Sequence, residues 1–386
     1  MISIGSGAGR QRKRRLLILS FSRIASDARV LRQVRLFAER YEVTTCGYGP
    51  APEGVDHHVL IPDDLVYWHK DRTLLLQRRY AAVHRTNAVV AHLWDRLPRG
   101  HFDVVLADDI DTLPLALSLR PRGGVHADLH EYASRENEES WRWRLFVAPY
   151  FRWLCRTFLP HAGSVSTVGE GLAAEYAREF GVEASVVVNA PRLADLVPAP
   201  VGEPLRLVHS GNARRNRDLA LMVDAVEATT RPVTLDLYLM PNDPAYLAEL
   251  RERVRDVPAV TIHEPVAPED LPRTLAAYDV GVFVLPPVTF NYLWTLPNKF
   301  FDFIQARLGI IVGPSPEMAG IVERHGLGAV TDDFTAGALA RVLDDLDPEQ
   351  VARWKQASHA VAPEYSAERQ AQGWADAVEA LAARVG

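Results

Sequence analysis

The sequence predicts an α/β protein with two Rossmann-like domains. Short apolar runs alternate with amphipathic helical patterns along nearly the whole chain, as an α/β fold requires. A proline-rich stretch separates one set of alternations from a second set, which indicates two domains rather than one. The length of 386 residues allows two domains of ordinary size, and a composition of 48% hydrophobic and 24% charged residues is typical of a globular protein.

The first predicted domain covers residues 15–195. Residues 1–14 are expected to form a flexible tail, and their glycine-rich stretch at 5–9 precedes the first strand, so it lacks the context of a dinucleotide-binding loop. Apolar residues at helical spacing predict a helix over residues 27–40. The predicted strands of this domain are Leu16–Leu19, Val43–Cys46, Val104–Ala107, Val125–Leu129, Val165–Thr167 and Ser185–Val188.

A linker is predicted over residues 196–204, where prolines cluster. The second domain is expected to cover residues 205–365. Its predicted strands are Leu205–His209, Thr234–Leu239, Val260–Ile262, Val280–Leu285 and Ile310–Val312. Residues 366–386 predict a final helix, with apolar side chains from Trp374 to Leu381 on one face.

Composition argues against several classes of protein. The net charge of −6 gives no general support for nucleic-acid binding. The two cysteines, Cys46 and Cys155, lie far apart without metal-ligand spacing, which argues against a zinc site or a disulfide framework and fits a reducing compartment. No apolar run approaches the ~18 residues of a membrane span, and residues 16–19 are too short for a signal-peptide core. We therefore expect a cytoplasmic protein.

The most informative segment is Pro297–Ala306, which is followed by the apolar run Leu308–Val312. It predicts a short helix that proline opens, since proline loses no hydrogen bond in the first helical turn, and then a buried strand. Asn298, Lys299 and Asp302 lie three and four residues apart and share one helix face. Such a polar face at a helix N-terminus suits a ribose and a phosphate. The alternative is an ordinary helix start with one surface ion pair.

This segment resembles the donor-binding signature of family 4 glycosyltransferases, which have the GT-B fold. The family pattern is a lysine, an acid one turn later, a turn of small residues and an apolar strand. Here Lys299, Asp302 and Ile310–Val312 occupy these positions, with Asp302 in place of the usual glutamate. Members often carry a second glutamate that touches the donor sugar, and Trp294 stands at that position.

The resemblance spans nearly the whole chain from residue 15 and carries several expectations. It implies two Rossmann-like domains that face each other across a cleft, with the final helix crossing back to the N-terminal domain. A nucleotide-diphosphate sugar would bind mainly to the C-terminal domain and an acceptor to the N-terminal domain. Transfer would retain the anomeric configuration and would need no obligatory metal or other cofactor, because cationic side chains would stabilise the leaving diphosphate.

A glycine and clustered cations follow the first strand of the second domain, a pattern that suits a pyrophosphate, although a solvated basic loop is the alternative. The family places an arginine directly after this glycine and a lysine several positions later. Asn212 and Arg217 hold these positions here, and Arg214 or Arg215 could compensate for Asn212. The resemblance thus implies catalytic roles for Arg217 and Lys299, and donor contacts for Gly211, Asn212, Tyr292, Asn298 and Asp302.

In the first domain, His130 and Glu131 follow a predicted strand. His130 resembles the strand-end histidine of the family, which implies a catalytic position and a hydrogen bond to the donor sugar rather than a role as general base. A structural histidine is the alternative. The loops after two other strands resemble acceptor-binding loops, so the acceptor is expected to contact Ser22, Arg23, Asp108, Asp109 and Glu131. Alternatively, Asp27 is only a helix cap, with Arg23 and Arg29 on the surface.

Two further patterns admit other interpretations. Asp109 and Asp111 follow a strand with the spacing of a cation-binding Asp-x-Asp motif, as in GT-A glycosyltransferases. Residues 142–158 form a basic, aromatic helical pattern that Pro149 should kink or split. Core packing is its commoner explanation, but such a helix also suits peripheral contact with the inner face of the cell membrane, with support from basic residues at 78, 79 and 85.

The sequence therefore predicts a nucleotide-sugar-dependent glycosyltransferase whose acceptor is a glycan, a glycolipid or a small molecule, as in bacterial polysaccharide, glycolipid or natural-product biosynthesis. Two rivals stay open. A GT-B-type sugar-nucleotide epimerase would need an acid/base carboxylate pair and no acceptor. A catalytically silent GT-B binding partner is motivated by Trp294 and Asn212, which depart from the family pattern.

Overall fold

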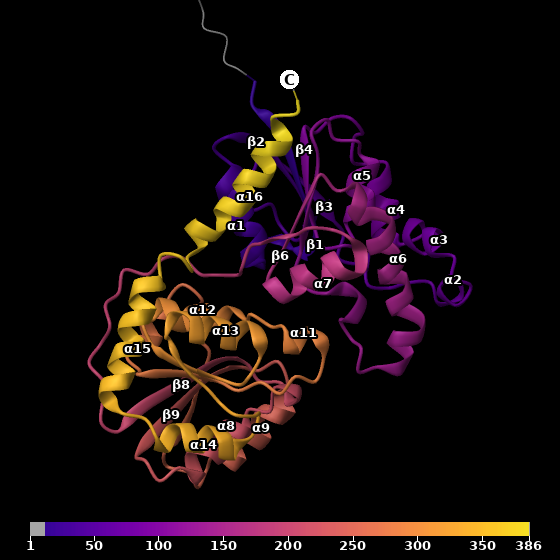
Figure 1. Ribbon diagram of the computed structural model, residues 1–386. Helices are drawn as coiled ribbons and strands as arrows, with labels where there is room; N and C mark the ends of the chain where they lie inside the picture. Colours follow the sequence, from indigo (N-terminus) through magenta and orange to yellow (C-terminus); the bar gives the residue numbers. More distant parts are fainter. Residues whose placement is uncertain (1–11, 386) are drawn as a thin grey trace, which may run out of the picture. The chain divides into compact units, whose positions relative to one another are not determined.

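The computed structural model describes residues 12–385 and contains two parallel β-sheets, each with helices on its faces (Figure 1). Most of the predicted tail, residues 1–11, lies outside the described residues. The chain divides into two compact units. The first unit comprises the described parts of Met1–His130, Tyr150–Ser166 and Trp374–Gly386, and the second comprises Glu131–Pro149 and Thr167–Gly373.

The first sheet has seven strands in the order β3-β2-β1-β4-β5-β6-β7. The neighbours from β3 to β5 pair in parallel. Its strands are β1 (Arg14–Arg23), β2 (Tyr41–Tyr48), β3 (His57–Ile61), β4 (Val104–Asp108), β5 (Gly124–Leu129), β6 (Ser164–Thr167) and β7 (Ser185–Val186). The accompanying helices are α1 (Ala28–Phe37), α2 (Arg72–Leu76), α3 (Tyr80–Arg85), α4 (Ala88–Trp94), α5 (Leu113–Ser118), α6 (Ala148–Phe158) and α7 (Glu170–Phe180).

The second sheet has six parallel strands in the order β10-β9-β8-β11-β12-β13. Its strands are β8 (Leu205–Asn212), β9 (Val233–Met240), β10 (Val260–His263), β11 (Val280–Phe283), β12 (Gly309–Val312) and β13 (Gly328–Val330). Its helices are α8 (Ala220–Ala228), α9 (Pro244–Arg253), α10 (Leu271–Leu275), α11 (Phe290–Leu293), α12 (Asn298–Gln305), α13 (Pro316–His325), α14 (Ala336–Asp344) and α15 (Pro348–Val361). The last helix, α16 (Ala367–Ala382), begins in the second unit and continues in the first, which includes Trp374–Gly386.

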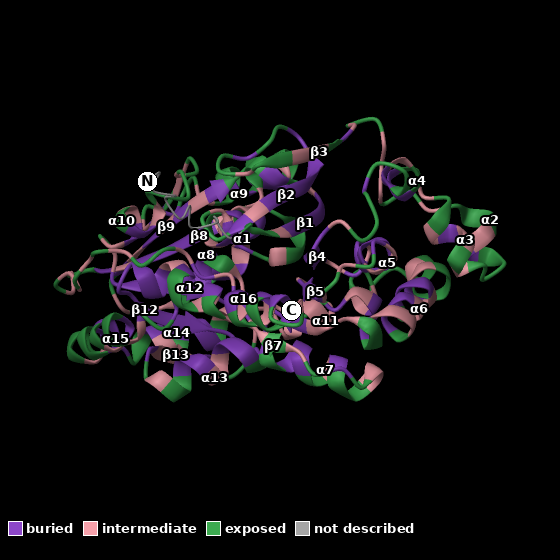
Figure 2. Cartoon of the chain, turned by 90° about the horizontal axis from the view of Figure 1, so that it is seen from above, coloured by how far each residue is buried: buried purple, intermediate pink, exposed green. Residues whose placement is uncertain are grey.

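In both sheets the strand order reverses beside the first strand of the sheet, between β1 and β4 and between β8 and β11. Open parallel sheets bind ligands outside the carboxyl ends of the strands at such a reversal. The central strands of both sheets are mostly buried, the edge strands β3, β7, β10 and β13 are partly exposed, and the outer faces of the helices are exposed (Figure 2). This is the pattern of a sheet covered by helices on both faces.

Helices α12 and α13 cover one face of the second sheet, and α8, α9 and α14 cover the other (Figure 1). Phe300, Phe301 and Phe303 of α12 are fully buried in a core with β8, β11 and β12. Gly281 in β11 permits this packing, because a Cβ at that position would collide with the ring of Phe303. The predicted helix and its packing phenylalanines are confirmed.

All eleven predicted strands are present, and the described residues add β3 and β13, which the sequence did not reveal. β3 is an edge strand without a regular apolar alternation, and β13 has only three residues. The predicted cap of α1 is confirmed, since Asp27 accepts hydrogen bonds from the backbone N–H groups of Arg29 and Val30. Pro149 does not split the predicted helix, since residues 141–158 are helical without a break; a π-helical segment over Trp143–Val147 directly precedes α6. No helix among the described residues is long and apolar enough to cross a membrane.

Candidate functional site

The strongest candidate site lies at the carboxyl end of β8, around Lys299. Pro297 precedes α12 with extended backbone, so Lys299 enters the first helical turn and its side chain points into the protein, with 6% of the residue exposed. Its Nζ lies 3.0 Å from Nε2 of His209 and 4.5 Å from the ring centroid of Phe283. Nδ1 of His209 lies 2.9 Å from the carbonyl oxygen of Val282. A carbonyl only accepts, so Nδ1 carries the proton and Nε2 offers its lone pair to Lys299.

Gly211 allows this arrangement. Its φ is +137°, a conformation that favours glycine, and a Cβ added there would lie 2.5 Å from Nζ of Lys299. The residue therefore allows both the positive φ near the end of β8 and the space for the lysine head group. The contact of Gly211 with the donor stays a prediction.

The Lys299 site places two cationic side chains together in a buried environment, which disfavours their charged forms. Burial first, and then the positive charge of Arg217, hold the pKa of Lys299 well below its usual range, while Asp302 acts in the opposite direction. Burial also lowers the pKa of Arg217, whose guanidinium lies 5.8 Å from the ring centroid of Tyr292. Burial and the neighbouring Lys299 lower the pKa of His209, so the imidazole stays neutral. An anion bound beside Lys299 and Arg217 would relieve this cost.

Several buried polar atoms at this end of the sheet lack a partner. Among the described residues, Ser210 Oγ, Arg217 Nε and Ser315 Oγ are buried and accept or donate no hydrogen bond. Ser210 lies near the end of β8, and Ser315 lies just after β12. Buried polar groups are nearly always hydrogen-bonded, so orphaned atoms at the carboxyl ends of neighbouring strands indicate room for a polar ligand.

His209, Ser210 and Ser315 were not predicted as site residues. Each is a polar residue at the end of an apolar strand or just after it, which is the signal that could have identified them. The remaining predicted donor residues surround the same end of the second unit. Asn298 is exposed and Asn212 is half-buried at the last position of β8. Their contact with a ligand stays a prediction.

One departure from the pattern of family 4 glycosyltransferases, Trp294, has a structural explanation. Trp294 packs against α7, where a Cβ added to Gly171 would collide with the indole ring. The ring therefore fills space within the second unit. Arg215, a candidate to compensate for Asn212, forms an exposed ion pair with Glu249 at 2.6 Å. That partner makes Arg215 the weaker of the two candidates.

The first unit contains a second cluster of charged residues, centred on Asp128 in β5. Arg29 of α1 donates two hydrogen bonds of 2.7 Å to the two oxygens of Asp128, and Ser166 donates another of 2.6 Å. Gln33, one turn after Arg29, donates to Asp108 at 2.8 Å and to Asp128 at 3.0 Å. The expectation that Arg29 lies on the surface is wrong, since Arg29 is buried and its guanidinium neutralises Asp128.

His130 lies at the edge of this cluster with carboxylates on both ring nitrogens. Nε2 lies 3.5 Å from oxygens of Asp108 and Asp128, and Nδ1 lies 3.3 Å from Asp109. Burial lowers the pKa of His130, but the three carboxylates outweigh it and raise the pKa well above the usual range. Burial raises the pKa of Asp108 to about 7 although His130 opposes the shift. Nε2 of His130 has no hydrogen-bond partner among the described residues. A charged imidazolium carries a proton on each ring nitrogen, so His130 suits a hydrogen-bond donor better than a general base.

Asp108 is buried, with 1% of the residue exposed. Its Oδ1 accepts a hydrogen bond from Gln33, so the predicted contact with an acceptor would involve Oδ2. Its Oδ2 has no hydrogen-bond partner among the described residues. Asp109 is half-exposed in a left-handed conformation. Ser22 lies at the end of β1 and contacts Ser20, while Arg23 forms an exposed ion pair with Asp63. Glu131 is exposed, and its backbone carbonyl accepts from Tyr176.

Asp108, Asp128 and His130 have ligand atoms close enough to hold a metal ion, all within 4.8 Å of one another. Their present partners fit a cation poorly, because both oxygens of Asp128 already accept short hydrogen bonds and Arg29 supplies the positive charge. The two carboxylates of the alternative Asp-x-Asp cation site, Asp109 and Asp111, have different partners. Asp109 faces His130, whereas Asp111 pairs with Lys70 at 3.4 Å.

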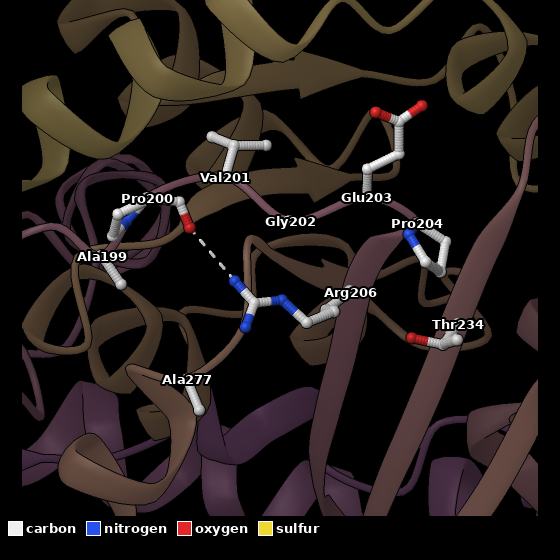
Figure 3. Close-up of a pocket in the computed structure, with 9 residues that line it drawn as sticks. All are labelled: Ala199, Pro200, Val201, Gly202, Glu203, Pro204, Arg206, Thr234 and Ala277. Carbon is white, nitrogen blue, oxygen red and sulfur yellow. Dashed lines mark hydrogen bonds between the residues drawn. The ribbon is translucent and has the colours of Figure 1, made fainter.

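A hollow of about 670 Å³ lies at the opposite, amino-terminal end of the second sheet, beside the predicted linker (Figure 3). Arg206 extends across it and donates a 3.1 Å hydrogen bond to the carbonyl oxygen of Pro200. Arg206 also forms a two-pronged ion pair with Asp279. Because these charges are paired within the protein and lie away from the strand carboxyl ends, the hollow does not belong to the Lys299 site.

Comparison with known proteins identifies the fold. No family model matches the chain, and no curated protein matches it. Its structure is similar to HepE from Anabaena in complex with UDP-glucose, with a TM-score of 0.67 and 14% identity over 95% of this chain and 99% of that chain. It is also similar to sucrose-phosphate synthase from Thermosynechococcus elongatus, with a TM-score of 0.66 and 12% identity over 95% of this chain and 100% of that chain.

A third similar structure is α,α-trehalose 6-phosphate synthase from Burkholderia multivorans, with a TM-score of 0.66 and 12% identity over 97% of this chain and 100% of that chain. At these identities the likeness establishes the fold alone. The predicted α/β architecture of the GT-B type is confirmed, with two parallel sheets and their covering helices.

Proposed function

We propose that this chain is a nucleotide-sugar glycosyltransferase of the family 4 type, which moves a hexosyl group to an acceptor with retention of configuration. The observation that carries the proposal is the buried cationic site at the end of β8, where Lys299 and Arg217 lie near unpartnered polar atoms. The fold supports it, since similar chains include HepE in complex with UDP-glucose, with UDP and glucose, and with UDP. A UDP-sugar is therefore the first donor to test.

The proposed chemistry assigns distinct roles to the residues of the Lys299 site. Lys299 and Arg217 would hold the diphosphate and stabilise the negative charge that develops on it as the glycosidic bond to the nucleotide breaks. Asp302 would hold ribose hydroxyls, and Tyr292, Asn298 and Asn212 would line the donor pocket. The orphaned Ser210 and Ser315 hydroxyls would complete the polar contacts.

The first unit would supply the transferred sugar and the acceptor with polar contacts. His130, as an imidazolium, would donate a hydrogen bond to the transferred sugar. Ser22, Arg23 and Asp109 would contact the acceptor, together with Glu131 of the second unit, and Asp108 would hold the charge of His130. Polysaccharide, glycolipid and small-molecule acceptors all fit these polar contacts. The proposal requires no metal ion, because the diphosphate charge is met by side chains.

Calorimetric titration of the protein with UDP, GDP, dTDP and ADP tests the donor site. We expect micromolar binding of one nucleotide, UDP first, with the same affinity in the presence of EDTA. Asp302→Ala should weaken that binding at least about tenfold, since hydrogen bonds to a charged group contribute roughly 1.5–3 kcal/mol. Glu323→Ala, which removes an exposed carboxylate from α13, is the matched control and should leave the affinity unchanged.

Each of the other outcomes supports a different site or function for this chain. Binding that needs a divalent cation would move the site to the carboxylates around Asp109. Failure of all four nucleotides to bind would favour the catalytically silent binding partner. If a nucleotide binds, incubation with the matching nucleotide sugar and NMR of the products decides between transfer with retention, transfer with inversion and C2-epimerisation without an acceptor.

A further inference from the structure

The first unit carries a strongly basic segment that the proposed chemistry does not use. Residues 65–100 contain seven lysine and arginine residues and two aspartates, a net charge of +5 in a chain whose total is −6. The rest of the chain is therefore strongly acidic. The segment contains α2, α3 and α4, and α2 and α3 lie at the outer edge of the first unit in both views (Figures 1 and 2).

The arginines around α2 and α3 are available to an outside partner. Arg72, Arg78, Arg79 and Arg85 are exposed, and none of them forms an ion pair with a described residue. Elsewhere on the surface, exposed arginines such as Arg253 pair with carboxylates. The short turn between the two helices thus presents positive charge that the protein itself does not neutralise.

Apolar side chains lie among these arginines. Leu76 ends α2, two positions before Arg78, and is 63% exposed, whereas the preceding Leu75 is buried. Trp68, in the segment that leads into α2, is 61% exposed. Exposed leucine and tryptophan beside unpaired arginines are the side chains that enter the interface of an anionic bilayer.

Aromatic packing joins α3 to α6. Tyr80 at the start of α3 packs against the rings of Tyr150 and Trp153 in α6, with centroids 6.0 and 5.9 Å apart. Tyr150, Phe151 and Leu154 of α6 are buried. The aromatic face of α6 therefore packs in the core, as its commoner interpretation has it, whereas Leu145 and Phe146 of the preceding π-helical turn are exposed and belong to the second unit. Within the first unit, the candidate membrane contact is the α2–α3 turn.

We propose that the α2–α3 surface, defined as Trp68, Arg72, Leu76, Arg78, Arg79 and Arg85, binds the anionic headgroups of a phospholipid bilayer. The arginines would attract the negative surface, and Leu76 and Trp68 would enter the boundary between headgroups and acyl chains. A bilayer fits better than a nucleic acid, because a phosphodiester backbone offers no apolar partner for the exposed Leu76 that follows Arg72 by one helical turn and precedes Arg78.

Vesicle flotation with the full chain tests the proposal. We expect the protein to float with vesicles of phosphatidylcholine and phosphatidylglycerol at 7:3, and not with phosphatidylcholine alone. Arg78→Glu with Arg79→Glu should lower the partition coefficient at least about 25-fold, since each cation near an anionic surface contributes about fivefold. Arg78→Lys with Arg79→Lys should retain most of the binding, and Leu76→Ser should lower it about fivefold through the lost apolar insertion.

Two controls have the same charge change. Lys13→Glu with Arg14→Glu alters another exposed basic pair of the first unit, and Arg273→Glu with Arg353→Glu alters exposed arginines of the second unit. Both should float nearly as the wild type does, and circular dichroism melting confirms that each variant is folded. The proposal is overturned by failure of the wild type to float. It is also overturned if Lys13→Glu with Arg14→Glu abolishes the binding. A third contrary result would come from an RNA oligonucleotide at the same salt: the wild type would bind it, the Arg78 and Arg79 variant would lose affinity for it, and the Leu76 variant would not.

Discussion

Two buried lysines stand at opposite ends of the same parallel sheet and have opposite surroundings. Lys355, at the amino-terminal end, donates to the carbonyl oxygen of Tyr278 at 2.7 Å and lies 3.3 Å from Asp279. Lys299, at the carboxyl end, has the neutral imidazole of His209 at 3.0 Å. The amino-terminal end is neutralised inside the protein, while the carboxyl end holds positive charge ready for an anion. Burial alone therefore does not separate a structural lysine from a binding lysine; the partner does.

The carboxylate at the amino-terminal end shows the same distinction. Burial would raise the pKa of Asp279, but Arg206 and Lys355 together hold it below the usual range. Asp128 in the first unit is also a buried carboxylate whose pKa Arg29 and its hydrogen-bond partners hold well below the usual range in spite of burial. Each of these two carboxylates is thus paired with cationic side chains of the protein itself. The Lys299 site places two cations together instead, with Asp302 as the carboxylate that acts on Lys299.

The largest expected effect on stability concerns the amino-terminal end. Lys355→Met should lower the free energy of unfolding by about 2–3 kcal/mol, because it leaves Asp279 buried with Arg206 as its remaining cation. Urea denaturation followed by tryptophan fluorescence measures it. Arg251→Met, which breaks an exposed pair with Glu264, is the control and should cost less than about 1 kcal/mol. Nucleotide affinity should be unchanged in both. Equal stability of Lys355→Met and the wild type would contradict the structural role.

Lys299→Met should do the reverse. We expect nucleotide affinity to fall at least about 100-fold, since a buried charge-assisted contact to phosphate is lost. The ligand-free variant should become more stable by about 1 kcal/mol. A lysine whose pKa is lowered on folding gives stability that is present above its unfolded pKa and lost as pH falls through its folded pKa, so at neutral pH the charge costs stability. Calorimetry and urea denaturation measure the two effects, and destabilisation like that of Lys355→Met would remove the distinction between the two ends.

The sequence predicted the local features of this comparison better than the long-range ones. The start of α12 at proline and the burial of its phenylalanines follow from residues a few positions apart, so the helix around Lys299 was predictable. The contact of Lys299 with His209 joins residues 90 positions apart, and that of Arg29 with Asp128 joins residues 99 apart. Such pairs depend on which strands become neighbours, which a single sequence does not reveal. The burial of Lys299 was missed for the same reason.

His209 offers a finer test of the carboxyl end. His209→Leu should weaken nucleotide binding about tenfold, because Lys299 loses the acceptor that fixes its head group beside Gly211. His209→Gln can place an amide oxygen near the position of Nε2 and should recover most of that loss. Calorimetry with the nucleotide that binds the wild type best measures both. Equal weakening by leucine and glutamine would show that ring packing against Phe283, rather than the acceptor, is what His209 supplies.

The smallest expected effect is the pH dependence of nucleotide affinity, and its sign distinguishes the two ends of the sheet. Below the lowered pKa of Lys299 in the free protein, the ammonium is already present and affinity should not change. Above that pKa, binding must take up a proton, since the diphosphate raises the pKa again, so affinity should fall as pH rises. One proton limits the fall to less than about tenfold per pH unit, and we expect about threefold.

Calorimetry above pH 7 in two buffers of different ionisation enthalpy detects the proton directly. Lys299→Arg keeps its charge and should abolish the dependence, whereas Lys355→Met should leave it intact. A rise in affinity with pH would mean that a group other than Lys299 controls the binding of the anion.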